Sequence, residues 1–251
     1  MAELLLFQLY GPLASWGEPA VGEYRPSATH PGKSQIVGLL GAALGLTREQ
    51  EPELAALVSG YGLAVRIDAE GELLRDFQTV TVPPAIALKN RPHATRLDEI
   101  EAFAEREKQN PKATNPILSW RDYRTDASWT CALWINNSAP HPLGELAQAL
   151  RYPRFVLYLG RKSCSPALPL NPKVMEAHNL RQAFDDYPMD ERLGTLPRHS
   201  KRRYIWEMPM PAGLETGFTA QERLWVVPRR DLPGSRRRWQ FTARDEHHAM
   251  A

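Results

Sequence analysis

The first candidate for chemistry is Gly32-Lys33-Ser34, which stands just before an apolar run at residues 36–46. The tripeptide Gly-Lys-Ser ends the phosphate-binding loop of many nucleotide hydrolases. The pattern is incomplete, because Ser27 stands where that loop needs glycine and Pro31 has no backbone N–H to offer a phosphate. We therefore predict no nucleotide site. These residues still predict the start of a helix, where backbone N–H groups and the charge of Lys33 could bind an anion. The alternative is a solvated first turn that binds no ligand.

A second set of residues could transfer protons. Tyr24, His30 and Lys33 lie within one short stretch, and a ribonuclease that works without metal needs such groups to activate a 2′-hydroxyl and to protonate the leaving oxygen. The favoured alternative is that they are loop residues with no shared chemistry. The sequence has no recognisable metal or nucleophile motif, and Cys131 and Cys164 have no metal-type spacing. We predict no catalytic residue, no metal, no cofactor and two free thiols.

RNA-binding signals are stronger. The stretch 119–129, SWRDYRTDASW, interleaves aromatic side chains with Arg121 and Arg124, and aromatic rings stack on unpaired bases while guanidinium groups bind phosphates. Arg161, Lys162 and Ser163 form a candidate phosphate-binding turn. Tryptophan and tyrosine also build ordinary cores, so each signal is only moderately specific.

The net charge of +2 hides an uneven distribution. Between Arg192 and Arg244 the basic residues far outnumber the acidic ones, with runs at 198–203 and 235–238. Clusters of this kind are typical of a surface that binds a polyanion. Solvated basic loops are the alternative.

The elements that would position these residues follow from hydrophobic periodicity. Predicted strands are 4–10, 62–68, 73–82, 130–136 and 154–160, and predicted helices are 36–46 and 142–150. Strands 62–68 and 73–82 are expected to form a hairpin. Without residues 83–129 the order is β-α-β-β-α-β, which predicts an α+β, ferredoxin-like or RRM-like domain.

Residues 83–129 read as an insertion with a helix of its own, started by a capping box at Thr95 and Asp98. An insertion of this length is more often functional than neutral. We expect residues 1–165 to form the RRM-like domain with this inserted thumb, and residues 166–251 to form a small β-rich region. In that region 204–208 and 223–227 predict short strands, and His247 and His248 a disordered tail.

No apolar stretch reaches the roughly 18 residues needed to cross a membrane. The N-terminal run at 4–10 has no basic segment before it, so it does not predict a signal peptide. We expect a cytoplasmic protein without a membrane partner.

Four blocks of the sequence resemble the CasD family of type I-E CRISPR Cascade complexes. The first, at 4–46, contains Gly11-Pro12, Trp16-Gly17, Arg25-Pro26, Lys33-Ser34 and the glycine-spotted helix. The others are LRDFQTV at 74–80, WRDYRTDASWTCALW at 120–134 and LYLGRKSC at 157–164, in the family's order. The resemblance is loose beyond about residue 170, so nothing is carried over to the arginine-rich tail.

The resemblance implies a RAMP-superfamily fold whose thumb reaches toward the next subunit. It also implies a non-catalytic RNA-binding protein that holds the 5′ handle of the crRNA, caps the backbone filament, contacts the backbone and large subunits, and meets target DNA indirectly. A metal-independent endoribonuclease that processes repeat RNA is the alternative. The expected RNA-binding residues are Arg25, Lys33, Ser34, Arg121, Tyr123, Arg124, Arg161, Lys162 and Ser163.

Overall fold

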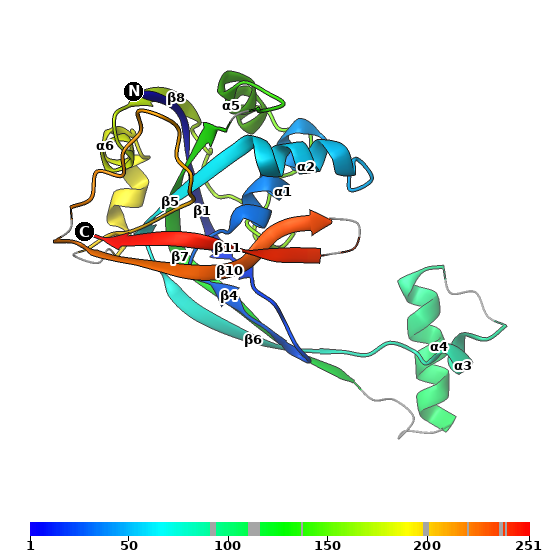
Figure 1. Cartoon of the computed structure of the whole chain (residues 1–251). Helices are drawn as coiled ribbons and strands as arrows, with labels where there is room; N and C mark the ends of the chain where they lie inside the picture. Colours follow the sequence, from blue (N-terminus) through cyan, green and yellow to red (C-terminus); the bar gives the residue numbers. More distant parts are fainter. Residues whose placement is uncertain are drawn as a thin grey trace.

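One large sheet organises the chain in the computed structural model (Figure 1), which describes residues 1–90, 94–109, 116–136, 138–197, 201–219, 221–235, 238 and 240–251. Within these residues the sheet has nine strands in the order β10-β11-β9-β5-β7-β1-β8, with β3 and β6 also paired to β7. The strands are β1 (Ala2–Ala14), β3 (Tyr24–Arg25), β5 (Tyr61–Ala69), β6 (Glu72–Val80), β7 (Ile117–Ile135), β8 (Lys173–Ala177), β9 (Arg203–Trp206), β10 (Arg223–Ser235) and β11 (Gln240–Met250). A small second sheet pairs β2 (Trp16–Gly17) with β4 (Ser27–Ala28).

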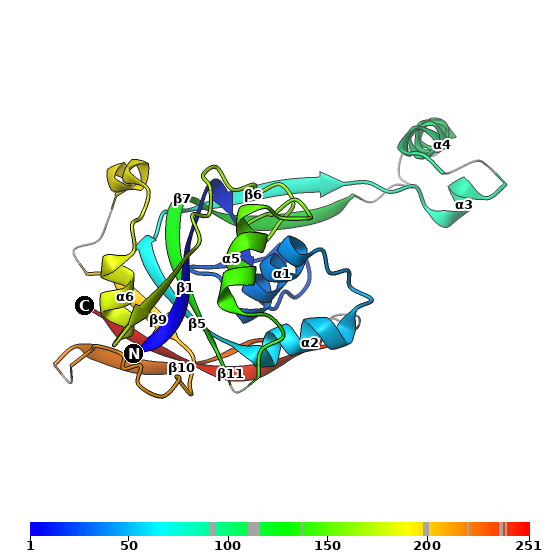
Figure 2. The ribbon, with the colours of Figure 1, turned by 90° about the horizontal axis from the view of Figure 1, so that it is seen from above.

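Helices cover both faces of the sheet's centre (Figure 2). One face carries α1 (Lys33–Leu44), α2 (Glu51–Gly60) and α5 (Leu143–Arg151); the other carries α6 (Leu180–Asp186), which leads to a 3₁₀ helix at Glu191–Thr195. Leu5 and Phe7 pack on the α1 side, while Leu4 and Leu6 pack on the α6 side. This two-sided burial explains the nearly continuous apolar run of β1 and confirms the strand predicted there. Each such buried side chain contributes about 1.5–3 kcal/mol.

The four central strands β5, β7, β1 and β8 pair antiparallel, with a helix after β1 and another after β7. The strand predicted at 154–160 is wrong, and β8 takes the place beside β1. Residues 154–160 form a loop because their N–H groups bond elsewhere: those of Arg154 and Phe155 donate to the carbonyls of Ala43 and Ala42 at the end of α1. The apolar pattern there reflects packing without strand pairing, since Leu157 and Leu159 are buried in the core.

The predicted hairpin of β5 with β6 is also wrong. Both strands pair with β7, β5 along its second half and β6 along its first, because β7 starts at Ile117, well before the predicted position 130. The chain bends at Glu70-Gly71 instead of reversing.

The ribbon of β6 and β7 extends away from the body and leads to α3 (Ala85–Leu88) and α4 (Arg96–Gln109), as Figures 1 and 2 show. The predicted capping box is confirmed, because the Asp98 N–H donates to Thr95 Oγ1 at 3.3 Å and the Thr95 N–H donates to Asp98 Oδ2 at 3.0 Å. We call β6, the first half of β7, α3 and α4 the arm. Residues 91–93 and 110–115 of the predicted thumb lie outside the described residues.

The C-terminal strands continue the main sheet, because β9 pairs with β5 and β11 pairs with β9. The expected disordered tail is wrong: His247 and His248 belong to β11, and His248 is buried. Cys131 and Cys164 are free thiols, as predicted, and both are buried. Among the described residues, no helix combines the length and apolarity needed to span a bilayer.

Candidate nucleic-acid interface

A groove of about 1440 Å³ runs beside α1. Its walls come from residues 15–20, the first turns and the end of α1, the loop 155–162 and the β10–β11 hairpin. Its volume exceeds the roughly 300–1,000 Å³ of ordinary small-molecule pockets. Four basic side chains line it: Arg48, Arg161, Lys162 and Arg230. The groove therefore offers room and positive charge for an extended anionic chain.

The loop 155–162 brings both charge and aromatic rings to this groove. Phe155 is 46% exposed and Tyr158 is 37% exposed, and both line the groove. Gly160 fixes the loop against the end of β1, because a Cβ there would lie 1.8 Å from the Ser15 carbonyl oxygen and its φ of +89° favours glycine. This close approach places Arg161 and Lys162 at the groove wall, and their role as a phosphate-binding turn stays a prediction. Ser163 is exposed next to them.

A basic face on β7 continues from the groove. Side chains alternate between the two faces of a strand, so Arg121 and Tyr123 share one face. Arg25 of β3 stands opposite Arg121 in the strand register. The Arg161 guanidinium lies over the Tyr123 ring at 4.6 Å and donates to the Arg25 carbonyl at 3.3 Å. We call Arg25, Arg121, Arg161 and Lys162 the basic face.

Tyr123 differs from its prediction as a base-stacking residue. It is only 7% exposed, and Arg161 covers its ring. Its ring positions a guanidinium and is not open to a base. Arg124 also departs from the predicted cluster, because alternation turns it to the opposite face of β7 together with Trp120.

That opposite face holds a separate polar group around Asp122. The Tyr24 hydroxyl donates to Asp122 Oδ2, and Arg75 Nε donates to Asp122 Oδ1 at 2.9 Å. The hydrogen bond to Asp122 raises the pKa of Tyr24 above its ordinary value. Burial works to raise the pKa of Asp122, but hydrogen bonds from Arg75 and Tyr24 outweigh it and hold this pKa low. Phe77 and Trp120 contact each other beside this group, with their ring centroids 4.4 Å apart and their planes tilted by 39°.

Lys33 does not face a ligand, which corrects its prediction as a phosphate contact. It is 3% exposed, and its ammonium donates to the Tyr61 carbonyl and to Glu207 Oε2, the latter at 2.7 Å. The anion at the start of α1 is a carboxylate of the chain itself: the Lys33 N–H donates to Asp231 Oδ2 at 2.7 Å. Gly32 allows this approach, because a Cβ there would lie 2.1 Å from the same oxygen. Ser34 is buried and lines the groove.

Asp231 belongs to a larger set of buried charges, which we call the α1 ion-pair network. Arg244 donates to Asp231 at 2.6 and 2.8 Å and also pairs with Glu207 and Glu246. The members are His30, Lys33, Glu207, Arg229, Asp231, Arg244, Glu246 and His248. The charges of its three basic and three acidic side chains cancel, and its two remaining members are histidines.

His30 is held neutral inside this network. Its Nε2 lies 3.1 Å from Glu246 Oε2 and 2.6 Å from Arg229 Nη1. Burial lowers the pKa of His30 to about 4, with a smaller lowering from the Arg229 charge. His30 and Lys33 are thus engaged in the network, while Tyr24 is engaged with Asp122. In the part of the chain that the structure describes, no three metal-binding side chains gather as a metal site.

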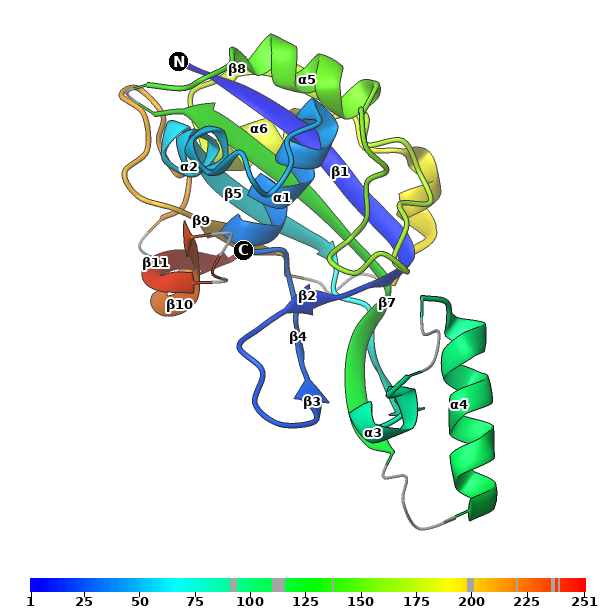
Figure 3. The same ribbon diagram turned by 90° about the vertical axis from the view of Figure 1, so that its right-hand side faces the viewer.

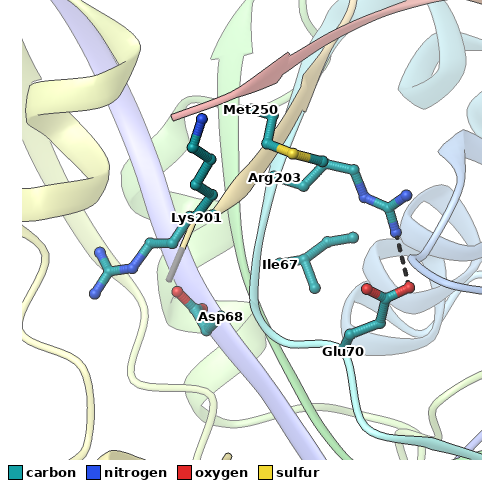
Figure 4. Close-up of a pocket in the computed structure, with 7 residues that line it drawn as sticks. Ile67, Asp68, Glu70, Lys201, Arg203 and Met250 are labelled. Atoms are coloured by element: carbon teal, nitrogen blue, oxygen red, sulfur yellow. Dashed lines mark hydrogen bonds and ion pairs between the residues drawn. The ribbon is translucent and has the colours of Figure 1, made fainter. Parts of the chain in front are cut away.

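A second, smaller pocket of about 350 Å³ lies on another part of the sheet (Figure 4). Lys201, Arg202 and Arg203 line it beside Asp68 and Glu70. Acids already pair with its arginines: Arg203 reaches Glu70 at 3.3 Å, as Figure 4 shows, and Arg202 reaches Asp185 at 3.3 Å. This pocket suits an anion less well than the groove does. Residues 198–200 and 236–237 of the predicted basic runs lie outside the described residues.

Sequence reasoning missed several groove residues. Phe155 and Tyr158 were hidden because their stretch has the alternation of a strand, and Arg48 and Arg230 stand outside any motif. Only the tertiary packing of α1 against the hairpin brings them together.

Comparisons with known proteins agree with this architecture. Residues 4–245 match the family model described as CRISPR-associated protein (Cas_Cas5). The chain is 35% identical over 187 residues to the "CRISPR system Cascade subunit CasD" of Escherichia coli (strain K12), covering 74% of this chain and 78% of that protein. Two solved structures share the fold at 24% identity. A chain of the "CRISPR RNA-guided surveillance complex" matches with a TM-score of 0.63, and the match covers 99% of this chain and 89% of that chain. The "Crystal structure of Cas protein" matches with a TM-score of 0.57, and the match covers 98% of this chain and 94% of that chain.

Proposed function

Because the chain belongs to the CasD family of CRISPR-associated Cas5 proteins, we propose that it is a non-catalytic RNA-binding subunit of a type I-E Cascade complex. In this proposal it holds the 5′ handle of the crRNA. The observation that carries the proposal is the continuity of the basic face with the groove through Arg161 and Lys162. Such a path of positive charge suits a single-stranded backbone.

The two parts of the path have different roles in this proposal. Arg25, Arg121, Arg161 and Lys162 bind phosphates, which gives affinity without reading sequence. The exposed rings of Phe155 and Tyr158 offer stacking surfaces for unpaired bases inside the groove. Stacking tolerates every base, so these rings add affinity for unpaired RNA over paired RNA.

The proposed function also gives a role to each part of the fold. We infer that β1, β5, β7 and β8 with α1 and α5 form the ferredoxin-like core of a RAMP protein, because their order in the sheet is β5-β7-β1-β8 with antiparallel pairing. The arm is the thumb that reaches a neighbouring subunit. The partners are then the crRNA, the backbone subunit whose filament this subunit caps, and the large subunit, with target DNA met indirectly.

The engagement of Tyr24, His30 and Lys33 supports the absence of catalysis. A general acid or base must reach the substrate's protons, whereas Lys33 and His30 are buried among compensating charges. The Tyr24 hydroxyl is bound by Asp122 and Arg75.

Titration of handle RNA at several salt concentrations tests the function. The double variant Arg25→Ala/Arg121→Ala removes two proposed phosphate contacts. The salt slope should then fall in magnitude by about 1.4, which is about 25-fold in affinity at 0.1 M salt. Arg192→Ala is the matched control, because Arg192 is exposed and pairs with Asp190 away from the groove.

Two outcomes would overturn the proposal. An equal slope in the double variant and in the wild type would mean that the basic face does not bind RNA. Site-specific cleavage of labelled repeat RNA in EDTA, lost in His30→Ala, would replace the binding role with the endoribonuclease.

A further inference from the structure

We propose that the C-terminal β10–β11 hairpin is an RNA-binding wall of the groove and that Arg230 on it contacts a phosphate of the bound strand. This inference rests on the proposed function. The family match extends to residue 245 and so includes most of the hairpin, but it assigns no role to the hairpin's residues. In the fold the hairpin lies beside α1 and α2 (Figure 3). Arg230, Asp231 and residues 240–242 of the hairpin line the groove.

A β-bulge gives Arg230 its direction. Arg229 pairs with Arg244 and Leu232 pairs with Thr242, so two residues of β10, Arg230 and Asp231, face the single intervening residue of β11. A bulge of this kind re-aims side chains, and bulges are frequent beside functional sites. Arg229 and Asp231 turn into the α1 ion-pair network, while Arg230 is exposed on the groove wall.

The network fixes this wall in place. Asp231 bonds to the start of α1, and Arg244 of β11 holds Asp231 and Glu246. Arg230 is itself steadied, because its Nε donates to the Phe241 carbonyl across the hairpin at 3.1 Å. A guanidinium held in this way loses less conformational entropy when it binds a phosphate.

Charge makes Arg230 the contact within this wall. Arg229 and Arg244 are balanced by the buried acids of the network, and Asp231 is likewise paired within it. Arg230 therefore brings positive charge to a groove that Arg48 and Lys162 also line. Cations on several walls, together with the exposed rings of Phe155 and Tyr158, fit a single-stranded nucleic acid better than an acidic peptide.

The test measures handle RNA binding to the full chain at several salt concentrations. Arg230→Ala should lower the magnitude of the salt slope by about 0.7 and weaken binding about fivefold at 0.1 M salt. Arg230→Lys keeps the charge and should retain the wild-type slope, and Arg230→Glu should weaken binding more than the alanine variant. Arg223→Ala is the matched control, because Arg223 is exposed on the same strand and does not line the groove.

The outcomes separate this inference from the function on which it rests. No handle binding by the wild-type chain, alone or assembled, would refute the proposed function. Wild-type binding with equal slopes for Arg230→Ala and Arg223→Ala would refute the role of the hairpin and leave the function standing. All variants should keep the wild-type unfolding temperature, since Arg230 lies outside the network; a large drop in Arg230→Ala would show that Arg230 has a structural role instead.

Discussion

Replacing Asp231 with asparagine removes one charge from a buried, balanced set while keeping the size of the side chain. The carboxylate accepts the Lys33 N–H at 2.7 Å and two Arg244 donors at 2.6 and 2.8 Å. Asparagine still caps a helix well, so the bond to the Lys33 N–H is largely retained. The main loss is one of the three acidic partners of Arg244, whose side chain is 10% exposed, so the network keeps three basic but only two acidic side chains.

The expected cost follows from the uncompensated charge. Breaking a buried ion pair by removing one partner destabilises a protein by about 3–5 kcal/mol. For a chain of this size the unfolding temperature should fall by about 6–20 °C, at 2–4 °C per kcal/mol. Calorimetry or circular dichroism at pH 7 measures this fall. Asp245→Asn is the matched control, because Asp245 is the exposed neighbour of Arg244 on β11.

A second variant shows whether charge balance is the cause. Asp231→Asn combined with Arg244→Met restores equal numbers of basic and acidic side chains, so the pair should cost less than the sum of the two single changes by about 0.5–3 kcal/mol. A loss below about 1 kcal/mol for Asp231→Asn, or strict additivity with Arg244→Met, would refute the reasoning that these charges are buried and coupled.

Two further predictions concern pH and the arm. The pKa of His30 is about 4 in the folded protein and about 6.5 in the unfolded chain, so the unfolded chain binds more protons between these two pH values. The contribution of neutral His30 to the free energy of unfolding is therefore complete above pH 6.5 and falls by about 3 kcal/mol as the pH drops to 4. Urea unfolding should show this pH dependence in the wild type and in the control His178→Gln, whose histidine is exposed, but not in His30→Gln. An unchanged pH dependence in His30→Gln would contradict the prediction. The arm exposes Ile86, Leu97 and Ile100, so protease cleavage within 94–109 should slow when RNA and neighbouring subunits are bound, whereas equal rates would make it an ordinary surface element.

The sequence by itself determined the elements whose patterns are local. The apolar run of β1, the helix that follows Gly32, the capping box of α4 and the amphipathic α5 all depend on residues close together in the chain. The turn at Arg161–Ser163 was predicted in the same way, although the strand expected before it does not form. The family blocks were recognisable for the same reason, because each is a short contiguous stretch.

Tertiary structure decided which of the candidate residues share a surface. Arg121 and Arg124 look like one cluster in the sequence, but the strand that carries them turns them to opposite faces. Lys33 looks like an anion contact, but Asp231, 198 residues further along the chain, supplies the anion. Nothing near Lys33 could signal that pairing, because the cost of burying a charge is met by partners that only the folded chain brings together.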